Sequence, residues 1–462
     1  MAKKKPAAKK DTTDYKKMDQ DIIDDFRSRP NAMPEDIDYE KYIIGTYIAK
    51  LPRKMDAFYM MQAVCVEQST GTFIPVPQET PENRRKHVAK VIGWWRIPDL
   101  EYEGAEDIFD NPKYYDYCCQ IAFPLNFRPQ FPMLFTTIYG NISMGGPLKM
   151  VDVRFPKEFL KEFKGPKFGD LGVREILGVP ERPLLNNMIK PCVYTDPKVG
   201  ADLAYQAAVG GCDVIKDDEL IADADFNPMV DRVVAFMEAL DKADSEKGEK
   251  TLYTVNITDR PDKMFEWADK VQEAGANALM VNHISVGYGA MRKLAEDPSV
   301  KVPILGHMDF AGTLYQDPLS GVSSPLILGK FGRLCGCDFI VTPAPYGKAP
   351  TRDDRFKEIC RNMVMPMANA PHIKRTMPMP SGGITVSLVE KVVNALGTNI
   401  MIGSGGGIHA HPSGPIAGAK AFRQAIDAAM EGISCKEYAK EHKELAESLG
   451  LFGFKKTEFS SV

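Results

Sequence analysis

Hydrophobic and polar positions follow two different rhythms along this chain, and the rhythm changes after Gly165-Pro166. Beyond that point, short apolar segments are each followed by a longer amphipathic stretch, which is the pattern of repeated βα units. Eight apolar segments qualify as strands: LLNNMIKP, CDVIKDD, TLYTVNIT, NALMVNH, VPILGH, CDFIVTP, RTMPMPS and NIMIGSG. Eight parallel strands close a TIM barrel. We therefore expect an α/β fold with a (β/α)8 barrel over residues 166–435.

The region before the barrel has a mixed pattern. From Ile43 to Phe155, strand-like runs such as YIIGTYIA, QIAFPL and KMVDVRF surround a helix predicted over residues 55–66. This combination indicates a compact α+β domain of the ferredoxin-like type over residues 41–165. After the barrel, residues 436–462 are expected to form a helical tail.

The first twenty residues, MAKKKPAAKKDTTDYKKMDQ, contain seven lysines and no apolar core, so they are not a secretory signal. Three aspartates and the lack of arginine also argue against a transit peptide. We predict a disordered, solvated tail over residues 1–40, in preference to a nucleic-acid or membrane tether.

Composition narrows the class of protein. The chain has 462 residues, of which 44% are apolar and 26% charged, so a large hydrophobic core is expected. Its net charge of -4 gives no strong positive field that would attract nucleic acid. Nine cysteines without a CxxC pair argue against a disulfide framework and for a reducing compartment. No apolar run approaches the roughly 20 residues of a membrane helix. We expect a soluble, cytoplasmic protein with a small-molecule partner, and neither nucleic acid nor membrane as partners.

The segment GGCDVIKDDE ends an apolar run with one lysine and three carboxylates. Alternation along a strand places Lys216 and Asp218 on one face, and Glu219 is one step into the loop. A lysine among metal-binding carboxylates is chemically reasonable if carbon dioxide has converted its amine to a carbamate, an oxygen anion that Mg2+ prefers. Taken alone, the same four charges are typical of a solvated surface run.

The other predicted strands also end in polar residues, and active sites of barrels are built at those carboxyl ends. These residues are Lys190, Asn256, Asn282, His283, His307, Lys348, Ser381 and the glycines 405–407. Their shared position favours a metal site at Lys216 over a surface charge run. The glycine-rich loops around residues 381–383 and 403–407 leave backbone N–H groups available for a phosphate. His409 and His411 are expected to shape the second of these loops through hydrogen bonds.

Together these motifs resemble the large subunit of ribulose-bisphosphate carboxylase (RuBisCO) over Ile43 to Phe452. GGCDVIKDDE is similar to the carbamylation and magnesium motif of that family. The resemblance implies that Lys216 is carbamylated by carbon dioxide and binds Mg2+ with Asp218 and Glu219.

The resemblance implies further roles along the chain. Lys190 is similar to the first lysine of the family's active-site pair, His307 to its strand-five histidine, and Lys348 to the mobile lysine after strand six. Phosphate-binding positions are implied for Thr72, Ser381, Gly383, Gly405 and Gly406. The segment EQSTGT, with Glu67 and Thr72, and the pair Gly140-Asn141 resemble segments that reach into a neighbouring subunit's site. A homodimer or higher homo-oligomer is therefore expected.

Several positions depart from the carboxylase pattern. Cys192 stands where carboxylases have the second lysine, Met308 where they have arginine, and Val341 where they have histidine; the residues after Lys348 also differ. Arginine and histidine hold one phosphate of the bisphosphate in the family, so their replacement predicts a monophosphate with an apolar far end near Met308 and Val341. This profile is that of the RuBisCO-like proteins.

The implied reaction is Mg2+-dependent enolisation of a phosphorylated ketose through an enediolate. The implied catalytic residues are Lys190, Lys216, His307, Lys348 and Asn141. Either a carbamate oxygen on Lys216 or the amine of Lys190 is the base. Relatives that enolise a diketo methylthiopentyl phosphate have lysine at the position of Asn141. The reaction therefore stays open: the protein is expected to be an isomerase of methylthio-ribulose phosphate, or an enolase or decarboxylase of another sugar-acid phosphate. A true carboxylase and a non-catalytic scaffold are alternatives of other classes.

Overall fold

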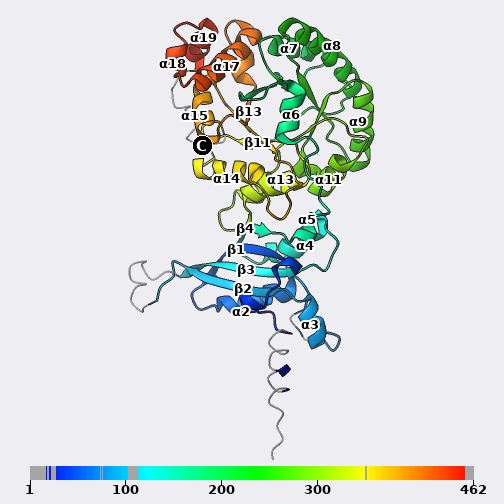
Figure 1. The fold of residues 1–462 in the computed structure, drawn as a ribbon, viewed down its shortest axis with the longest axis vertical. Helices are drawn as coiled ribbons and strands as arrows, with labels where there is room; N and C mark the ends of the chain where they lie inside the picture. Colours follow the sequence, from blue (N-terminus) through cyan, green and yellow to red (C-terminus); the bar gives the residue numbers. More distant parts are fainter. Residues whose placement is uncertain are drawn as a thin grey trace, which may run out of the picture. The chain divides into compact units, whose positions relative to one another are not determined.

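The computed structural model describes residues 17, 20, 21, 28–72, 74, 76–101, 113–348 and 351–452. The chain divides into two compact units (Figure 1). Unit 1 comprises Met1–Glu158 with Pro318–Gly321, and unit 2 comprises Phe159–Asp317 with Val322–Val462. Most of the predicted Lys-rich tail, and residues 453–462 of the predicted helical tail, lie outside the described residues.

Unit 1 is built on a five-stranded sheet with the order β10-β4-β1-β3-β2. Its elements are η1 (Pro34–Asp36), η2 (Tyr39–Lys41), β1 (Tyr42–Pro52), α2 (Ala57–Glu67), α3 (Pro81–His87), β2 (Lys90–Ile97), β3 (Tyr114–Pro124), α4 (Phe131–Tyr139), η4 (Asn141–Met144), β4 (Leu148–Arg154) and β10 (Gly321–Val322). Strand β1 pairs antiparallel with β3 and β4, and β2 pairs antiparallel with β3. The mixed pattern before the barrel thus forms the predicted α+β arrangement.

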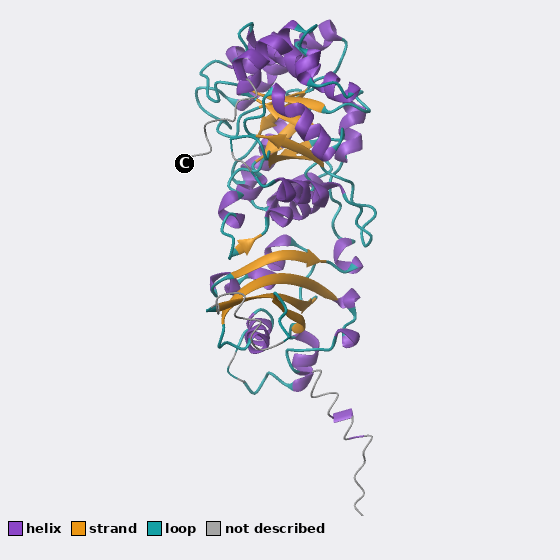
Figure 2. Cartoon of the chain, turned by 90° about the vertical axis from the view of Figure 1, so that its left-hand side faces the viewer, coloured by secondary structure: helices purple, strands orange, loops and turns teal. Residues whose placement is uncertain are grey.

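Helices α2 and α4 pack on this sheet (Figure 2). Helix α2 begins where Asp56 accepts a hydrogen bond from Tyr59 N, within two residues of the predicted start. Its Phe58 ring stacks on Trp94 of β2 at 4.4 Å between centroids. Tyr47 of β1 donates its hydroxyl hydrogen bond to Ile138 O of α4 at 2.6 Å. These contacts hold the start of α2 against β2 and the end of α4 against β1.

Unit 2 is an eight-stranded parallel barrel wrapped by helices (Figure 1). Its strands are β5 (Leu184–Met188), β6 (Val214–Lys216), β7 (Leu252–Asn256), β8 (Ala278–Val281), β9 (Ile304–Gly306), β11 (Phe339–Pro343), β12 (Met377–Ser381) and β13 (Met401–Ser404). The helices are α5 (Lys157–Leu160, at the boundary of the units), α6 (Gly169–Leu177), α7 (Pro197–Val209), α8 (Met229–Lys247), α9 (Pro261–Glu273), α10 (His283–Val286), α11 (Tyr288–Glu296), α12 (Gly312–Tyr315), η5 (Pro325–Lys330), α13 (Phe331–Leu334), α14 (Asp353–Val364), α15 (Val386–Leu396), α16 (Gly406–His409), α17 (Gly414–Glu431), α18 (Cys435–Tyr438) and α19 (Lys443–Phe452). All eight predicted strands are confirmed.

The strands follow the order β12-β11-β9-β8-β7-β6-β5-β13. The ring closes where β13 lies beside β12, because a side chain on Gly403 would begin 2.9 Å from Ser381 Oγ. Apolar side chains fill the interior: Leu184, Val214, Leu252, Met280, Leu305, Phe339, Val341, Met377, Met379 and Met401. The polar residues singled out in the sequence therefore collect at the carboxyl rim of a packed barrel.

Two expectations from composition can be compared with the described residues. All nine cysteines lie among them and are free, and the sulfur atoms of Cys335 and Cys337 are 3.8 Å apart. Within the same part of the chain, no helix combines the length and apolar character that crossing a membrane requires.

Candidate active site

The end of β6 carries a buried cluster of charges. Lys216 and Asp218 are 1% and 2% exposed, so this segment is not a solvated charge run. Lys216 Nζ donates a hydrogen bond to Glu219 Oε2 at 3.3 Å. Lys190, just after β5, donates from Nζ to Asp218 Oδ2 at 2.5 Å. Four predicted site residues from two adjacent strands thus lie together as two ion pairs.

The two lysines of this cluster differ in protonation. Burial lowers the pKa of Lys216, although the neighbouring carboxylates oppose this effect. A lowered pKa favours the neutral amine, which is the form that reacts with carbon dioxide. Burial also acts to lower the pKa of Lys190, but its hydrogen bonds to Asp218 and Cys192 outweigh burial and raise the pKa. Lys216 is therefore suited to carbamylation, whereas Lys190 is held as an ammonium.

A magnesium ion fits this cluster after carbamylation of Lys216. In the part of the chain that the structure describes, no group of three or more His, Cys, Asp or Glu side chains is placed to hold a metal. A carbamate on Lys216 would add an oxygen anion beside Asp218 and Glu219 and remove a positive charge. Mg2+ prefers such hard oxygen donors. The donor set is complete only in the modified form.

Asp217, between the two inward residues, points the opposite way. Its Oδ2 accepts hydrogen bonds from Arg232 Nε and Nη2 at 3.2 and 3.1 Å, and both side chains are fully buried. Its Oδ1 accepts a hydrogen bond from Tyr253 OH at 2.7 Å. Arg232 also donates to the backbone carbonyl oxygens of Ala222 and Asn227 in the loop after Glu219. This ion pair fixes the backbone that carries the candidate metal ligands.

Polar residues on the next strands complete the rim around Glu219. Asn256 Nδ2 donates to Ile221 O at 2.9 Å, which holds the loop after β6. Asn282 Nδ2 lies 3.5 Å from Glu219 O, and Asn282 Oδ1 is buried without a hydrogen-bond partner among the described residues. An orphaned buried oxygen at this position is consistent with a site that binds a further group.

His307 meets the same cluster from β9. Its Nε2 lies 3.4 Å from Glu219 Oε2, and its Nδ1 accepts a hydrogen bond from Asp309 N at 3.2 Å. Burial, with the charge of Lys216, lowers the pKa of His307 well below its usual range. The ring is therefore neutral, and because Nδ1 is an acceptor, the proton sits on Nε2 and points to Glu219.

The two glycine-rich loops lie at the same rim. A side chain on Gly405 would begin 3.2 Å from Lys190 Cε, so glycine permits the close approach of this loop to Lys190. Lys348 N donates a hydrogen bond to Gly382 O at 2.8 Å, which places the lysine of the β11 loop beside the loop after β12. His409 Nε2 and Asn187 Oδ1 are 3.0 Å apart, which supports the expected loop-shaping role of this histidine. Phosphate binding by these loops stays a prediction.

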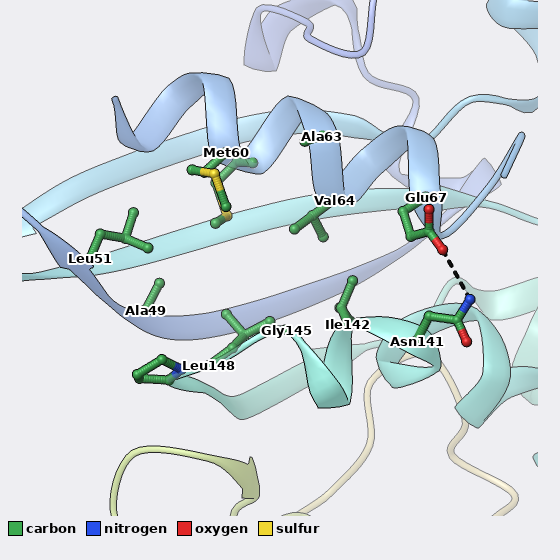
Figure 3. Close-up of a pocket in the computed structure, with 12 residues that line it drawn as sticks. Ala49, Leu51, Met60, Ala63, Val64, Glu67, Asn141, Ile142, Gly145 and Leu148 are labelled. Carbon is green, nitrogen blue, oxygen red and sulfur yellow. Dashed lines mark hydrogen bonds between the residues drawn. The ribbon is translucent and has the colours of Figure 1, made fainter. Parts of the chain in front are cut away.

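Unit 1 contains three of the predicted site residues, Glu67, Thr72 and Asn141. Asn141 Nδ2 donates a hydrogen bond to Glu67 Oε1 at 2.9 Å, at one end of a cavity of about 380 Å³ (Figure 3). A second cavity, of about 280 Å³, shares only these two residues with the first. Thr72 Oγ1 instead bonds to the backbone of Ile74 in an exposed segment. The structure thus pairs Glu67 with Asn141, whereas the hydrogen bonds of the Thr72 hydroxyl are local.

The apolar replacements noted in the sequence do not make an open pocket at Val341. Val341 is 2% exposed and belongs to the cluster that fills the barrel, and Met308 packs against the same cluster. Since the strand alternation turns Val341 inward, it is a packing residue. The burial of Val341 therefore does not support an apolar end at that residue, whereas Met308 is only partly buried and the expectation there stays a prediction.

Acid is expected to destabilise the protein through a buried histidine. Burial lowers the pKa of His283 to about 4, against roughly 6.5 when unfolded. A depressed pKa contributes stability that is complete above pH 6.5 and is lost as the pH falls toward 4. The free energy of unfolding should therefore drop by roughly 2–3 kcal/mol between pH 7 and pH 4.5 through this residue alone. In urea unfolding, the free energy of unfolding of His283→Leu should depend less on pH than that of the wild type. Exposed His87→Gln should keep the wild-type pH dependence. The same pH dependence in all three proteins would contradict the role of His283.

Comparison with known proteins extends over both units. A family model for the ribulose bisphosphate carboxylase large chain, catalytic domain, matches residues 171–452. A ribulose bisphosphate carboxylase-like protein from Archaeoglobus fulgidus is 54% identical over 428 residues, covering 92% of this chain and 96% of its own. A 2,3-diketo-5-methylthiopentyl-1-phosphate enolase from Geobacillus thermodenitrificans is 34% identical over 418 residues, covering 89% and 98%. Among solved structures, a dimeric archaeal Rubisco from Hyperthermus butylicus aligns with a TM-score of 0.79 and 29% identity, covering 91% of this chain and 98% of its own.

The family model covers more than half of the chain, and the two relatives cover nearly all of it. The fold agrees, since the chain aligns with the solved relative over most of both chains. The chain therefore belongs to the ribulose bisphosphate carboxylase large-chain family, as one of its RuBisCO-like proteins.

Proposed function

We propose that this protein is an Mg2+-dependent enolising enzyme that acts on a phosphorylated ketose with a single phosphate. The observation that carries the proposal is the buried cluster of Lys216, Asp218 and Glu219, with Lys190 bound to Asp218 at 2.5 Å. The coarse class, an enolase-type enzyme, is supported by the name of the Geobacillus relative. Isomerisation would follow this proton removal, whereas decarboxylation would reach an enediolate by loss of carbon dioxide instead, so an enediolate is common to these reactions.

Carbamylated Lys216, Asp218 and Glu219 are the residues that would hold Mg2+. When bound, the ion supplies positive charge that stabilises the oxygen of an enolate. Neutral His307 donates from Nε2 toward Glu219 and so keeps this carboxylate oriented. Asn256 and Arg232 hold the surrounding loop and backbone.

Lys190 is the proposed proton shuttle. Its Nζ lies between Asp218 Oδ2 and Cys192 Sγ, at 2.5 and 2.9 Å. These hydrogen bonds raise the pKa of Lys190. If Asp218 bound a metal instead of Lys190, this contribution would be lost, and the neutral amine that can accept a proton would be favoured. The thiol of Cys192 stands where the carboxylases have a second lysine, and this supports enolisation without carboxylation.

Substrate phosphate is proposed to bind at Gly383, Gly405 and Gly406, with Ser381 and Thr72 nearby in the shared site. Lys348, exposed after β11, is proposed to contact substrate from its loop. Glu67, Thr72 and Asn141 would reach the site of a second copy in a homodimer, an arrangement supported by the dimeric archaeal relative.

Deuterium wash-in tests this function. With Mg2+ and bicarbonate present, a panel of ketose and keto-acid monophosphates should include a compound that exchanges a carbon-bound proton with solvent. Lys190→Met should slow this exchange by roughly 10²–10⁴-fold, the usual effect of removing a general base. Lys198→Met, at an exposed position of α7, is the matched control. No exchange with any compound despite measured Mg2+ binding would overturn the enolising function. Full exchange in Lys190→Met would overturn the role of Lys190 as proton shuttle.

A further inference from the structure

The loop after β9 contains a strained residue. Phe310 has a φ of 66°, and among the described residues it is the only one other than glycine with a positive φ. A β-turn closes around it, because Ala311 N donates a hydrogen bond to Met308 O at 3.1 Å. Positive φ at the third position is the mark of a type II turn, in which glycine or asparagine is the usual residue. A phenylalanine at this position is a strained outlier.

Packing of the side chain does not account for this strain. Phe310 is 58% exposed, so its ring adds little to the hydrophobic core. Strained backbone persists where the surrounding structure requires it, and such residues cluster at functional sites. The strain at Phe310 therefore points to the backbone that the turn places.

The turn places one backbone amide against His307. Asp309 is the second residue of the turn, and its N–H donates a hydrogen bond to His307 Nδ1 at 3.2 Å. A ring nitrogen that accepts a hydrogen bond carries no proton, so neutral His307 carries its proton on Nε2. This nitrogen lies 3.4 Å from Glu219 Oε2. The turn thus determines what His307 presents to a proposed metal ligand.

The other tautomer of His307 would not suit this position. With the proton on Nδ1, the lone pair of Nε2 would face the carboxylate of Glu219, and two acceptors would meet. Glu219 Oε2 now also accepts a hydrogen bond from Lys216 Nζ at 3.3 Å. Carbamylation would replace this ammonium by an anion, so the orientation of Glu219 would depend more strongly on the Nε2–H group of His307.

We infer that the turn at residues 308–311 is a positioning element of the active site: it holds Phe310 in a strained conformation so that the Asp309 amide fixes the Nε2–H tautomer of His307, which orients Glu219. The inference rests on the proposed function for the role of Glu219 as a ligand. The tautomer itself is a property of the free protein and can be measured without metal or substrate.

Asp309→Pro tests the amide and keeps the turn. Proline fits the second position of a type II turn but has no N–H group. In 15N NMR of the imidazole nitrogens, with His307 assigned by His307→Gln, the wild type should show mainly the Nε2–H form. Asp309→Pro should raise the share of the Nδ1–H form several-fold and weaken Mg2+ binding in the presence of bicarbonate by roughly 10–100-fold, the usual effect of losing a group that orients a ligand. Asp309→Ala keeps the N–H group and, as the matched control, should keep the wild-type tautomer and Mg2+ affinity.

Variants of Phe310 test the strain. Asparagine tolerates positive φ, so Phe310→Asn should keep the Nε2–H tautomer and raise the ratio of folded to unfolded protein by roughly fivefold in urea unfolding. Valine is branched at Cβ and disfavours positive φ, so Phe310→Val should lower this ratio and shift the tautomer as Asp309→Pro does; it repeats the tautomer test if proline prevents folding. Phe226→Asn, at a half-exposed phenylalanine without a positive φ, should bring no gain in stability.

The outcomes separate this inference from the enolising function. An unchanged tautomer in Asp309→Pro would overturn the inference and leave the function standing. A changed tautomer with wild-type Mg2+ affinity would also overturn it, because the turn would then not act on the metal site. If the tautomer and the Mg2+ affinity change together but no monophosphate exchanges a proton in the wild type, the function fails and the inference stands. A Phe310→Asn variant no more stable than the wild type would contradict the assigned strain.

Discussion

Lys216→Ala is expected to reduce Mg2+-dependent proton exchange by at least about 10³-fold, since it removes the amine that completes the proposed metal site. The remaining carboxylates, Asp218 and Glu219, provide two of the three proposed ligands, and loss of a single preorganised charge-stabilising group already lowers rates by roughly 10²–10³-fold. Two measurements without turnover should change together with the rate. The 13C NMR signal of the carbamate formed from labelled carbon dioxide should disappear, and calorimetry should show weaker Mg2+ binding.

Stability provides the control for this substitution. Because burial lowers the pKa of Lys216, its removal should leave the free energy of unfolding unchanged or slightly higher. Lys198→Ala, at an exposed position, should change neither carbamate signal nor exchange. A carbamate signal that persists in Lys216→Ala would show that another lysine is modified, and unchanged exchange would remove Lys216 from the mechanism.

Arg232→Ala should lower the free energy of unfolding by about 3–5 kcal/mol, because it leaves the buried carboxylate of Asp217 without its charged partner. Urea unfolding measures this change. In the folded fraction, Mg2+ affinity in the presence of bicarbonate should fall by roughly 10–100-fold, the usual effect of removing a partner that orients ligands. The reason is geometric: Arg232 ties Asp217 to the loop that follows Glu219.

Two further variants control this prediction. Tyr253→Phe removes only the hydroxyl that donates to Asp217 and should cost about 1–2 kcal/mol. Arg260→Ala breaks the exposed pair with Asp262 and should change stability by less than about 1 kcal/mol. If Arg232→Ala were no more destabilising than Arg260→Ala, the buried pair would not hold this loop.

The barrel could be predicted because the sequence pattern of each strand is local. Each strand is a short apolar segment, and parallel topology places all eight carboxyl ends at one rim. This is why Lys190, Lys216, Asp218, Glu219 and His307 were found from sequence and lie together. Period-two alternation also predicted that Lys216 and Asp218 share a face, which in turn sends Asp217 outward to Arg232.

Other features depend on contacts that sequence patterns do not encode. Arg232 lies in the run MVDRVVAFM, where a charged residue on a predicted helix is expected at the surface. Its full burial depends on the ion pair with Asp217, just after β6. The cavity in unit 1 depends on how α2, β1 and η4 meet. Val341 reads as a substitution at the active-site rim, yet its side chain belongs to the barrel interior.

The close contact between the loops after β11 and β12 has a mechanical consequence. Lys348 N donates to Gly382 O, and a side chain on Gly347 would begin only 1.9 Å from the same oxygen. The two loops are therefore joined by a backbone hydrogen bond and close packing, so a displacement of one loop moves the other. Any residue larger than glycine at position 347 would separate the two loops, and Lys348 would then move independently of the loop after β12.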